Sequence, residues 1–194
     1  MNFLSRKKVV NILSATTLIA LTALSSSKLM ADSGNPLVGG AAMYADKNII
    51  ENAVNSKNHT TLVAAVKAAG LVDTLQGEGP FTVFAPVNSA FANLPEGAVA
   101  NLLKPENKAA LTTVLTCHVV GVSALSGAIK KMISDDSGQH PVKTLGGCVL
   151  QATYDNGEIS LEDENGRIAK VTIADVKQSN GVIHVIDKVL LPKS

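Results

Sequence analysis

The residues of this chain that could perform chemistry are two cysteines, four histidines and two short acidic runs. The sequence contains no Gly-x-Ser-x-Gly motif and no glycine-rich loop that ends in Lys and Ser or Thr. It therefore lacks the local signatures of an α/β-hydrolase and of a P-loop nucleotide-binding protein. We predict no catalytic residues and no cofactor, and we expect the chain not to be an enzyme.

The histidines and acidic runs do not follow a metal-binding pattern. His118 and His184 stand within apolar, β-prone runs, where a structural imidazole that hydrogen-bonds to nearby backbone is favoured over a metal ligand. No His-x-His or His-x-x-x-His spacing occurs. The runs 135–138 and 162–166 contain carboxylates but do not fit the twelve-residue calcium loop. Solvated turns are the favoured interpretation, and no metal site is predicted.

The first 31 residues have the layout of a secretory signal peptide. Arg6, Lys7 and Lys8 precede an uncharged, mostly apolar stretch over 9–24, and small residues follow up to Ala31. This stretch is shorter than the roughly 20 apolar residues of a membrane span. We expect cleavage after Ala31, a secreted or periplasmic protein, and no stable membrane span after cleavage.

Export gives the two cysteines a structural role. In an oxidising compartment Cys117 and Cys148 are expected to form a disulfide, and two buried free thiols are the alternative.

The part after residue 31 is mildly acidic, because it holds all the acidic residues while Arg6, Lys7, Lys8 and Lys28 leave with the signal. With no Trp and only two Tyr, it offers neither a basic stripe nor a stacking platform, which excludes nucleic acid as a partner.

The periodicity of apolar residues divides the chain into a helical first half and a β-rich second half. Helical spacing occurs over 49–54, 62–69, 99–103 and 111–115, and Gly70 is placed to end the second of these helices. Phe81 to Ala85 is predicted to be a short strand, after which Asn88 is placed to cap a brief helix.

Alternation then predicts a hairpin over 148–162 with its turn at 155–157, a strand around 169–173, and a strand over 182–186 that is covered on both faces. Helices followed by antiparallel strands indicate an α+β domain, with the helices packed on a sheet or sandwich.

Two blocks resemble the signature blocks of the fasciclin-domain family: Gly79 to Phe91, with Phe84, Pro86, Asn88 and Phe91, and Asn180 to Leu190, with His184 and Asp187. The resemblance extends over 48–192, after a lead segment over 32–47, and single-domain secreted bacterial members look closest. The resemblance implies a β-sandwich or wedge flanked by helices, with the helices mainly in the N-terminal half. Domains of this family are found on extracellular proteins and are associated with cell adhesion.

The resemblance also suggests binding residues. In animal members, integrin contacts are ascribed to an Asp-Ile pair and to a tyrosine-histidine motif. Asp175-Val176 resembles the first by position, and Cys117-His118 resembles the second. Because a cysteine replaces the tyrosine, and Ile173-Ala174 stands where some animal domains carry Glu-Pro, an integrin ligand does not carry over. Asp175, Val176 and His118 are the tentative binding residues.

Two main hypotheses about function follow. The first is an exported binding or adhesion module that contacts a surface or matrix protein or polysaccharide through Asp175, Val176 and the loop 134–140, since loops on a rigid scaffold concentrate binding residues. The second is a carrier of a small apolar ligand or lipid, which requires an aliphatic cavity of several hundred Å³. A hydrolase with an unrecognised site is a third, lesser alternative.

Overall fold

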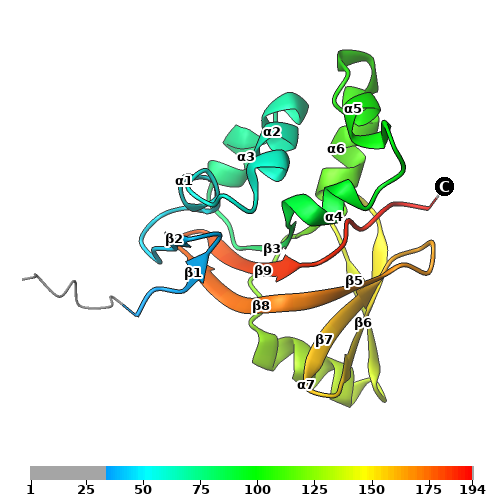
Figure 1. Cartoon of the computed structure of the whole chain (residues 1–194). Coiled ribbons are helices and arrows are strands. Elements are labelled where there is room, and N and C mark those ends of the chain that lie inside the picture. Colours follow the sequence, from blue (N-terminus) through cyan, green and yellow to red (C-terminus); the bar gives the residue numbers. More distant parts are fainter. Residues whose placement is uncertain (1–33, 194) are drawn as a thin grey trace, which may run out of the picture. The chain divides into compact units, whose positions relative to one another are not determined.

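The computed structural model describes residues 34–193 (Figure 1). The predicted signal peptide therefore lies outside the described residues. Within the described part, no helix combines the length and the hydropathy that crossing a membrane requires. The compact unit begins at Gly34.

The helices occupy mainly the first half of the described chain, as the sequence predicts. Asn48 and Glu51 form a capping box at the start of the first helix, and Gly70 ends the second with a positive φ of 73°, which glycine adopts without steric cost. The helices are α1 (Ile49–Ala53), α2 (Thr60–Ala69), α3 (Val72–Gln76), α4 (Asn88–Ala92), α5 (Ala98–Leu102), the 3-10 turn η1 (Pro105–Asn107), α6 (Lys108–Thr116) and α7 (Ser126–Asp135).

Seven strands form one sheet in the order β4-β3-β9-β8-β7-β6-β5, and β1 pairs with β2 separately. The strands are β1 (Leu37–Val38), β2 (Ala41–Ala42), β3 (Phe81–Pro86), β4 (Val119–Val120), β5 (Gln139–Lys143), β6 (Val149–Asp155), β7 (Glu158–Glu162), β8 (Ile168–Gln178) and β9 (Gly181–Ile186). The predicted hairpin is β6–β7, with its turn at Asn156 and Gly157, both at positive φ.

The two signature blocks lie side by side at the centre of this sheet. β3 and β9 pair in parallel, so that Phe84 stands opposite His184. After its first residue, β9 is buried throughout, which confirms the strand predicted to be covered on both faces. The α+β architecture expected from the sequence, with helices mainly in the first half and strands in the second, is therefore observed.

Apolar side chains pack into two cores on opposite sides of the central strands. Helices α1 to α6 cover one side of β3 and β9, where Val83, Ile183 and Val185 meet the helices. On the other side α7 packs with strands β6 to β9 through Ile129 and Ile133 (Figure 1). The sequence interpretation missed α7 and β5 and treated 134–140 as a loop. In the structure, Ser134 and Asp135 are helical and Gln139 begins a strand.

The role of Asn88 differs from the predicted one. Its side chain does not cap its own helix, whose N-cap residue is Val87. Instead, Asn88 Oδ1 accepts hydrogen bonds from Thr61 N at 3.0 Å and Thr60 Oγ1 at 3.2 Å, and Nδ2 donates to Lys57 O at 2.9 Å. Asn88 thus caps the start of α2. Sequence spacing alone does not reveal this, because the two positions meet only when the chain folds.

The lead segment is part of the packed domain. Gly39 and Gly40, both at positive φ, form the turn between β1 and β2. Val38 and Met43 are buried in the core beneath the helices. Gly39 O accepts a hydrogen bond from Lys57 N at 3.2 Å, which ties this hairpin to the segment before α2.

Candidate binding surface

Asp175 sits at an irregularity in β8 and holds the start of α7. The register of β8 against β9 shifts around this point, and Asp175 has a φ of 61°. Its carboxylate accepts hydrogen bonds from Ser126 N at 2.6 Å and Ser126 Oγ at 2.5 Å. Burial by itself raises the pKa of Asp175, but the hydrogen bonds from Ser126 and the charge of Lys130 outweigh it and lower the pKa. Asp175 is thus an ionised cap on the positive end of α7.

His184 fixes the backbone on either side of this cap. Its Nε2 bonds with Ala124 O at 2.9 Å, and its Nδ1 accepts a hydrogen bond from Asp175 N at 3.3 Å. The first bond needs a proton on Nε2 and the second needs a free lone pair on Nδ1, so the ring is neutral. Burial lowers the pKa of His184 against the opposing effects of the Ala124 carbonyl and Asp175. His184 therefore joins β9, β8 and the entry to α7.

His118 is enclosed by backbone in the same way. Nδ1 lies 2.8 Å from Val114 O, and Nε2 accepts a hydrogen bond from Leu190 N at 2.9 Å. Burial lowers the pKa of His118 to about 4, although the Val114 carbonyl and the charge of Asp163 favour protonation. The ring is neutral at physiological pH and links the end of α6 to the C-terminal segment.

The structure does not bring the three tentative binding residues together at an exposed site. Val176 and His118 are buried, with 0% and 2% of their surface exposed, and only Asp175 lies near solvent. Val176 and His118 are placed to support the strand and the helix, and a partner would reach neither side chain without rearrangement. The binding role of the three residues stays a prediction.

The other signature residues are placed in or next to the paired central strands. Phe84 is buried and its ring stacks with that of His184, with the ring centres 5.8 Å apart. Pro86 ends β3, and Phe91 packs into the core beneath the helices. Asp187 Oδ1 accepts a hydrogen bond from Lys170 N at 2.7 Å, so it continues the contact between β8 and β9 beyond the last residue of β9.

Cys117 and Cys148 form a disulfide, as expected. It connects the C-terminal end of α6 to the start of β6. Two backbone hydrogen bonds run beside it, from Leu145 N to Val119 O at 2.7 Å and from Gly146 N to Thr116 O at 3.0 Å. Together these links hold the loop before β6 against β4, where the two edges of the sheet approach each other.

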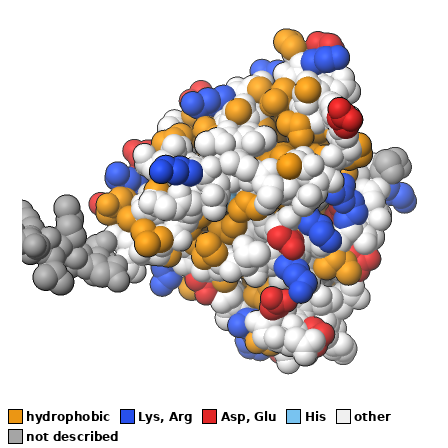
Figure 2. All heavy atoms as spheres, in the orientation of Figure 1, with side chains coloured by type: hydrophobic (Ala, Val, Ile, Leu, Met, Phe, Trp, Pro, Cys, Tyr) orange, Lys and Arg blue, Asp and Glu red, His pale blue; other side chains and the backbone are white. Residues whose placement is uncertain are grey.

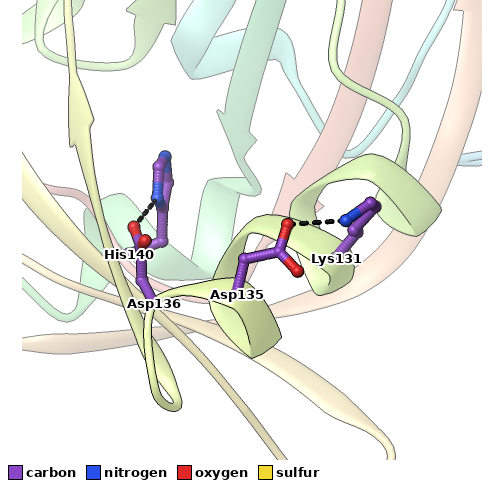
Figure 3. A network of polar contacts seen from close by, with 4 residues as sticks. All are labelled: Lys131, Asp135, Asp136 and His140. Atoms are coloured by element: carbon purple, nitrogen blue, oxygen red, sulfur yellow. Dashed lines mark hydrogen bonds and ion pairs between the residues drawn. The ribbon is translucent and has the colours of Figure 1, made fainter.

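The far end of α7 carries a small group of charged residues (Figure 3). Lys131 Nζ lies 2.6 Å from Asp135 Oδ2, and His140 Nδ1 lies 2.6 Å from Asp136 Oδ2. Ser137 and Gly138, both at positive φ, make the tight turn between them. The second pair connects the end of α7 to β5, which positions the turn that sequence analysis singled out.

The acidic runs do not converge on a metal site in the part of the chain that the structure describes. No group of three or more His, Cys, Asp or Glu there is arranged to hold an ion. The carboxylate of Asp163 instead accepts hydrogen bonds from Asn165 N, Arg167 N and Leu191 N at 2.9 to 3.0 Å. This residue organises its own turn and fastens the C-terminal segment, a role that sequence analysis missed.

The core offers little room for the lipid of the carrier hypothesis. The apolar cavity between the β1–β2 hairpin, α1 to α3 and the central strands has a volume of about 50 Å³, and a second, mostly apolar cavity between β3, α7 and β5 has a volume of about 130 Å³. Both volumes are below the several hundred Å³ that a lipid-sized ligand requires. On the surface, Figure 2 shows hydrophobic side chains gathered over α5 and α6, and charged side chains of both signs over the strands below them.

Comparison with known proteins identifies the fold and its relatives. A model of the fasciclin domain matches residues 57–192. Protein sll1483 of Synechocystis sp. is 46% identical over 156 residues, which cover 80% of this chain and 79% of that protein. Immunogenic protein MPT70 of Mycobacterium tuberculosis is 30% identical over 208 residues, covering 95% of this chain and 98% of that protein.

A solved structure of a FAS1 domain pair supports the same fold. The pair comes from the insect cell adhesion molecule Fasciclin I, and it superposes with a TM-score of 0.65 at 20% identity. The match covers 75% of this chain and 51% of that one, so the chain spans about half of the insect pair.

Proposed function

The chain belongs to the fasciclin-domain family, and from this membership we propose that it is an exported, non-enzymatic adhesion module that contacts a surface or matrix macromolecule. Fasciclin domains are associated with cell adhesion and extracellular binding, and proteins of the family are typically non-catalytic. Export rests on the expected signal peptide over 1–31, and the Cys117–Cys148 disulfide is consistent with an oxidising compartment.

We place the contact surface on the outward side of α7, together with Asp175 at its start and His140 beyond its end; this is the α7 face. The observation that carries this assignment is that one helix connects the two regions singled out in the sequence. Ser126, the first residue of α7, bonds to Asp175, and the turn after Asp135 leads to His140. A helix of ten residues spans about 15 Å, a distance suited to one macromolecular contact.

The chemistry of the α7 face favours a polar partner. Its exposed residues include Gly127, Ala128, Lys131 and Ser134, and the apolar side of the helix is turned inward through Ile129 and Ile133. Small and charged side chains on a helix held at both ends can approach a protein or polysaccharide surface closely. Val176 contributes indirectly, because it anchors the strand that carries Asp175.

The test is adhesion of a deletion strain complemented with variants of the full chain. Lys131→Glu reverses an exposed charge at the centre of the α7 face, where the side chain is 75% exposed. Because exposed ion pairs contribute little to stability, the variant is expected to fold normally and to lose adhesion. Adhesion to protein-coated and to polysaccharide-coated surfaces distinguishes the two partner classes.

Lys104→Glu is the matched control, because Lys104 is also exposed but follows α5, on the opposite side of the central strands. It should leave adhesion at the wild-type level. If the deletion strain adheres like its parent under every condition, the adhesion function is wrong. If the deletion strain adheres poorly but the Lys131→Glu variant restores adhesion fully, the adhesion function holds and its assignment to the α7 face is wrong.

A further inference from the structure

Strand β5 forms one edge of the seven-stranded sheet, and within residues 34–193 it pairs with β6 alone. The hydrogen bond from Thr144 N to Cys148 O, at 3.0 Å, continues the register of this pair. Residues of an antiparallel pair alternate between bonding to the partner strand and facing away from it. The backbone groups of the even-numbered residues therefore face β6, and those of Gln139, Pro141 and Lys143 face outward.

The outward-facing backbone groups of β5 are open to an added strand. All three residues that carry them are exposed at the surface. Pro141 has no N–H, so the edge offers the N–H groups of Gln139 and Lys143 together with the three carbonyl oxygens. Immediately after β5, Leu145 N donates outward to Val119 O of β4 at 2.7 Å. The edge is thus oriented for strand pairing, and an unpaired edge of this kind can bind an extended peptide.

An apolar cavity of about 130 Å³ lies beside this edge, lined by Ile129 of α7 and Val142 of β5. Pro141 and Lys143 line it too, so the outward-facing edge forms part of its rim. Val122, in the chain after β4, also lines the cavity and is 55% exposed, so the cavity reaches the surface. A dry apolar cavity of roughly 150 Å³ holds a benzene molecule. The space therefore suits one aliphatic side chain of a bound peptide.

We propose that an extended segment of a partner protein binds here, adding a strand to the outer edge of β5 and placing one apolar side chain in the cavity. A polypeptide offers both the alternating amide groups and the apolar side chain, whereas a lipid chain has no amides and a polysaccharide has no aliphatic side chain. The site adjoins the α7 face, but peptide binding does not depend on the proposed adhesion function.

The charge of the edge indicates which residue the partner strand carries. Lys143 is the one Lys, Arg, Asp or Glu among the described residues of the cavity wall, and it is exposed. Opposite charges on facing strands attract, so the partner strand places an acidic residue beside Lys143, next to the apolar residue that enters the cavity.

A second copy of β5 fits this edge poorly. Proline and lysine on an edge strand protect it against pairing with copies of itself. In two β5 strands paired around Pro141, neither central residue would have an N–H to donate, and each strand would bring a lysine rather than an acidic residue. The edge therefore favours a different chain, one that supplies N–H groups to the Pro141 carbonyl and a carboxylate to Lys143.

The test uses the mature protein and a capped peptide, acetyl-Thr-Thr-Glu-Leu-Glu-Thr-Thr-amide, in which glutamates flank the leucine so that either strand direction brings one near Lys143. Amide hydrogen exchange of Lys143 is followed by NMR. Because the Lys143 N–H faces outward, it should exchange about tenfold more slowly when nine-tenths of the protein is bound, since only the free protein then exchanges. No binding at millimolar peptide, or an unchanged Lys143 exchange rate in the bound protein, would overturn the proposal.

A matched pair of substitutions tests the role of the cavity. Ala124 is half-buried in the cavity wall, so Ala124→Phe should fill the space and abolish peptide binding. Ala109→Phe makes the same change at an exposed position of α6 and should leave binding intact. Undiminished binding to a folded Ala124→Phe variant would place the leucine elsewhere and contradict the proposal. If Ala124→Phe does not fold, the exchange of Lys143 in the wild-type protein still decides the question.

A charge exchange tests the orientation of the peptide against the edge. Lys143→Glu should bind the glutamate peptide roughly two- to fivefold more weakly than wild type does, and should prefer a version in which lysine replaces both glutamates. Lys104→Glu alters an exposed charge after α5 and should keep the wild-type preference. If Lys143→Glu also keeps that preference, the peptide does not lie along β5.

Discussion

The ring of His118 bonds on both sides to backbone groups, those of Val114 and Leu190. His184 does the same with Ala124 and Asp175. In both cases the two ring nitrogens join backbone groups of two different segments, so both polar atoms have partners although the histidine stands within an apolar run. The sequence indicates this role by context, but the partners lie up to 72 residues away and emerge only from the fold.

His118 should make stability depend on pH. Burial lowers its pKa to about 4 from 6.5, so the unfolded chain binds a proton between these values and the folded one does not. The stabilisation is complete above about pH 6.5 and is lost as pH falls toward 4, by about 3 kcal/mol. In urea unfolding at pH 4 to 7, the free energy of unfolding of His118→Gln should therefore vary less with pH than that of the wild-type protein.

His140→Gln serves as the control, because His140 is partly exposed and bonds to Asp136 at the surface. The free energy of unfolding of His140→Gln should keep the pH dependence of the wild-type protein. If the curves of wild type and His118→Gln run parallel over the whole range, His118 is not the group responsible.

At the scale of elements, the disulfide fastens α6 to β6 across 31 residues of chain, with Cα atoms 5.4 Å apart. Removing it with Cys117→Ala and Cys148→Ala together should lower the free energy of unfolding by about 3 kcal/mol, mainly because the unfolded chain regains freedom. Wild-type protein unfolded under reducing conditions retains both sulfur atoms, so it separates loss of the bond from loss of packing. Equal stability of the oxidised and reduced proteins would contradict the prediction.

How well each element could be predicted follows from its hydrophobic pattern. The hairpin β6–β7 alternates regularly and contains Asn156-Gly157, so its position and turn were both predictable. Helix α7 was missed although Ile129, Met132 and Ile133 have helical spacing, because charged and small residues fill the rest of the segment. The candidate surface depends on that helix, so sequence could name Asp175 and the 134–140 segment but could not join them.

At the scale of the whole molecule, the lead segment changes where the functional unit begins. The family match starts at residue 57, and the sequence interpretation started the domain at residue 48. The structure shows that the chain from Gly34 onward belongs to one compact unit. Ser179 N donates a hydrogen bond to Lys47 O at 2.9 Å, which ties the end of the lead segment to the turn before β9. Helical periodicity could not reveal this packing, because two strands of two residues each carry almost no pattern.

Two neighbouring residues of β1 provide a test of whether the lead segment packs into the core. Val38 is 3% exposed and faces the core, whereas Leu37 is 68% exposed. Val38→Ala should lower the free energy of unfolding by about 2 kcal/mol, since it removes buried methyl groups and leaves a cavity, whereas Leu37→Ala should change it by less than about 0.5 kcal/mol. Both values come from urea unfolding of the mature protein. If the two substitutions have equal effects, the hairpin does not contribute to the core in solution, and the cavity beneath it loses one of its walls.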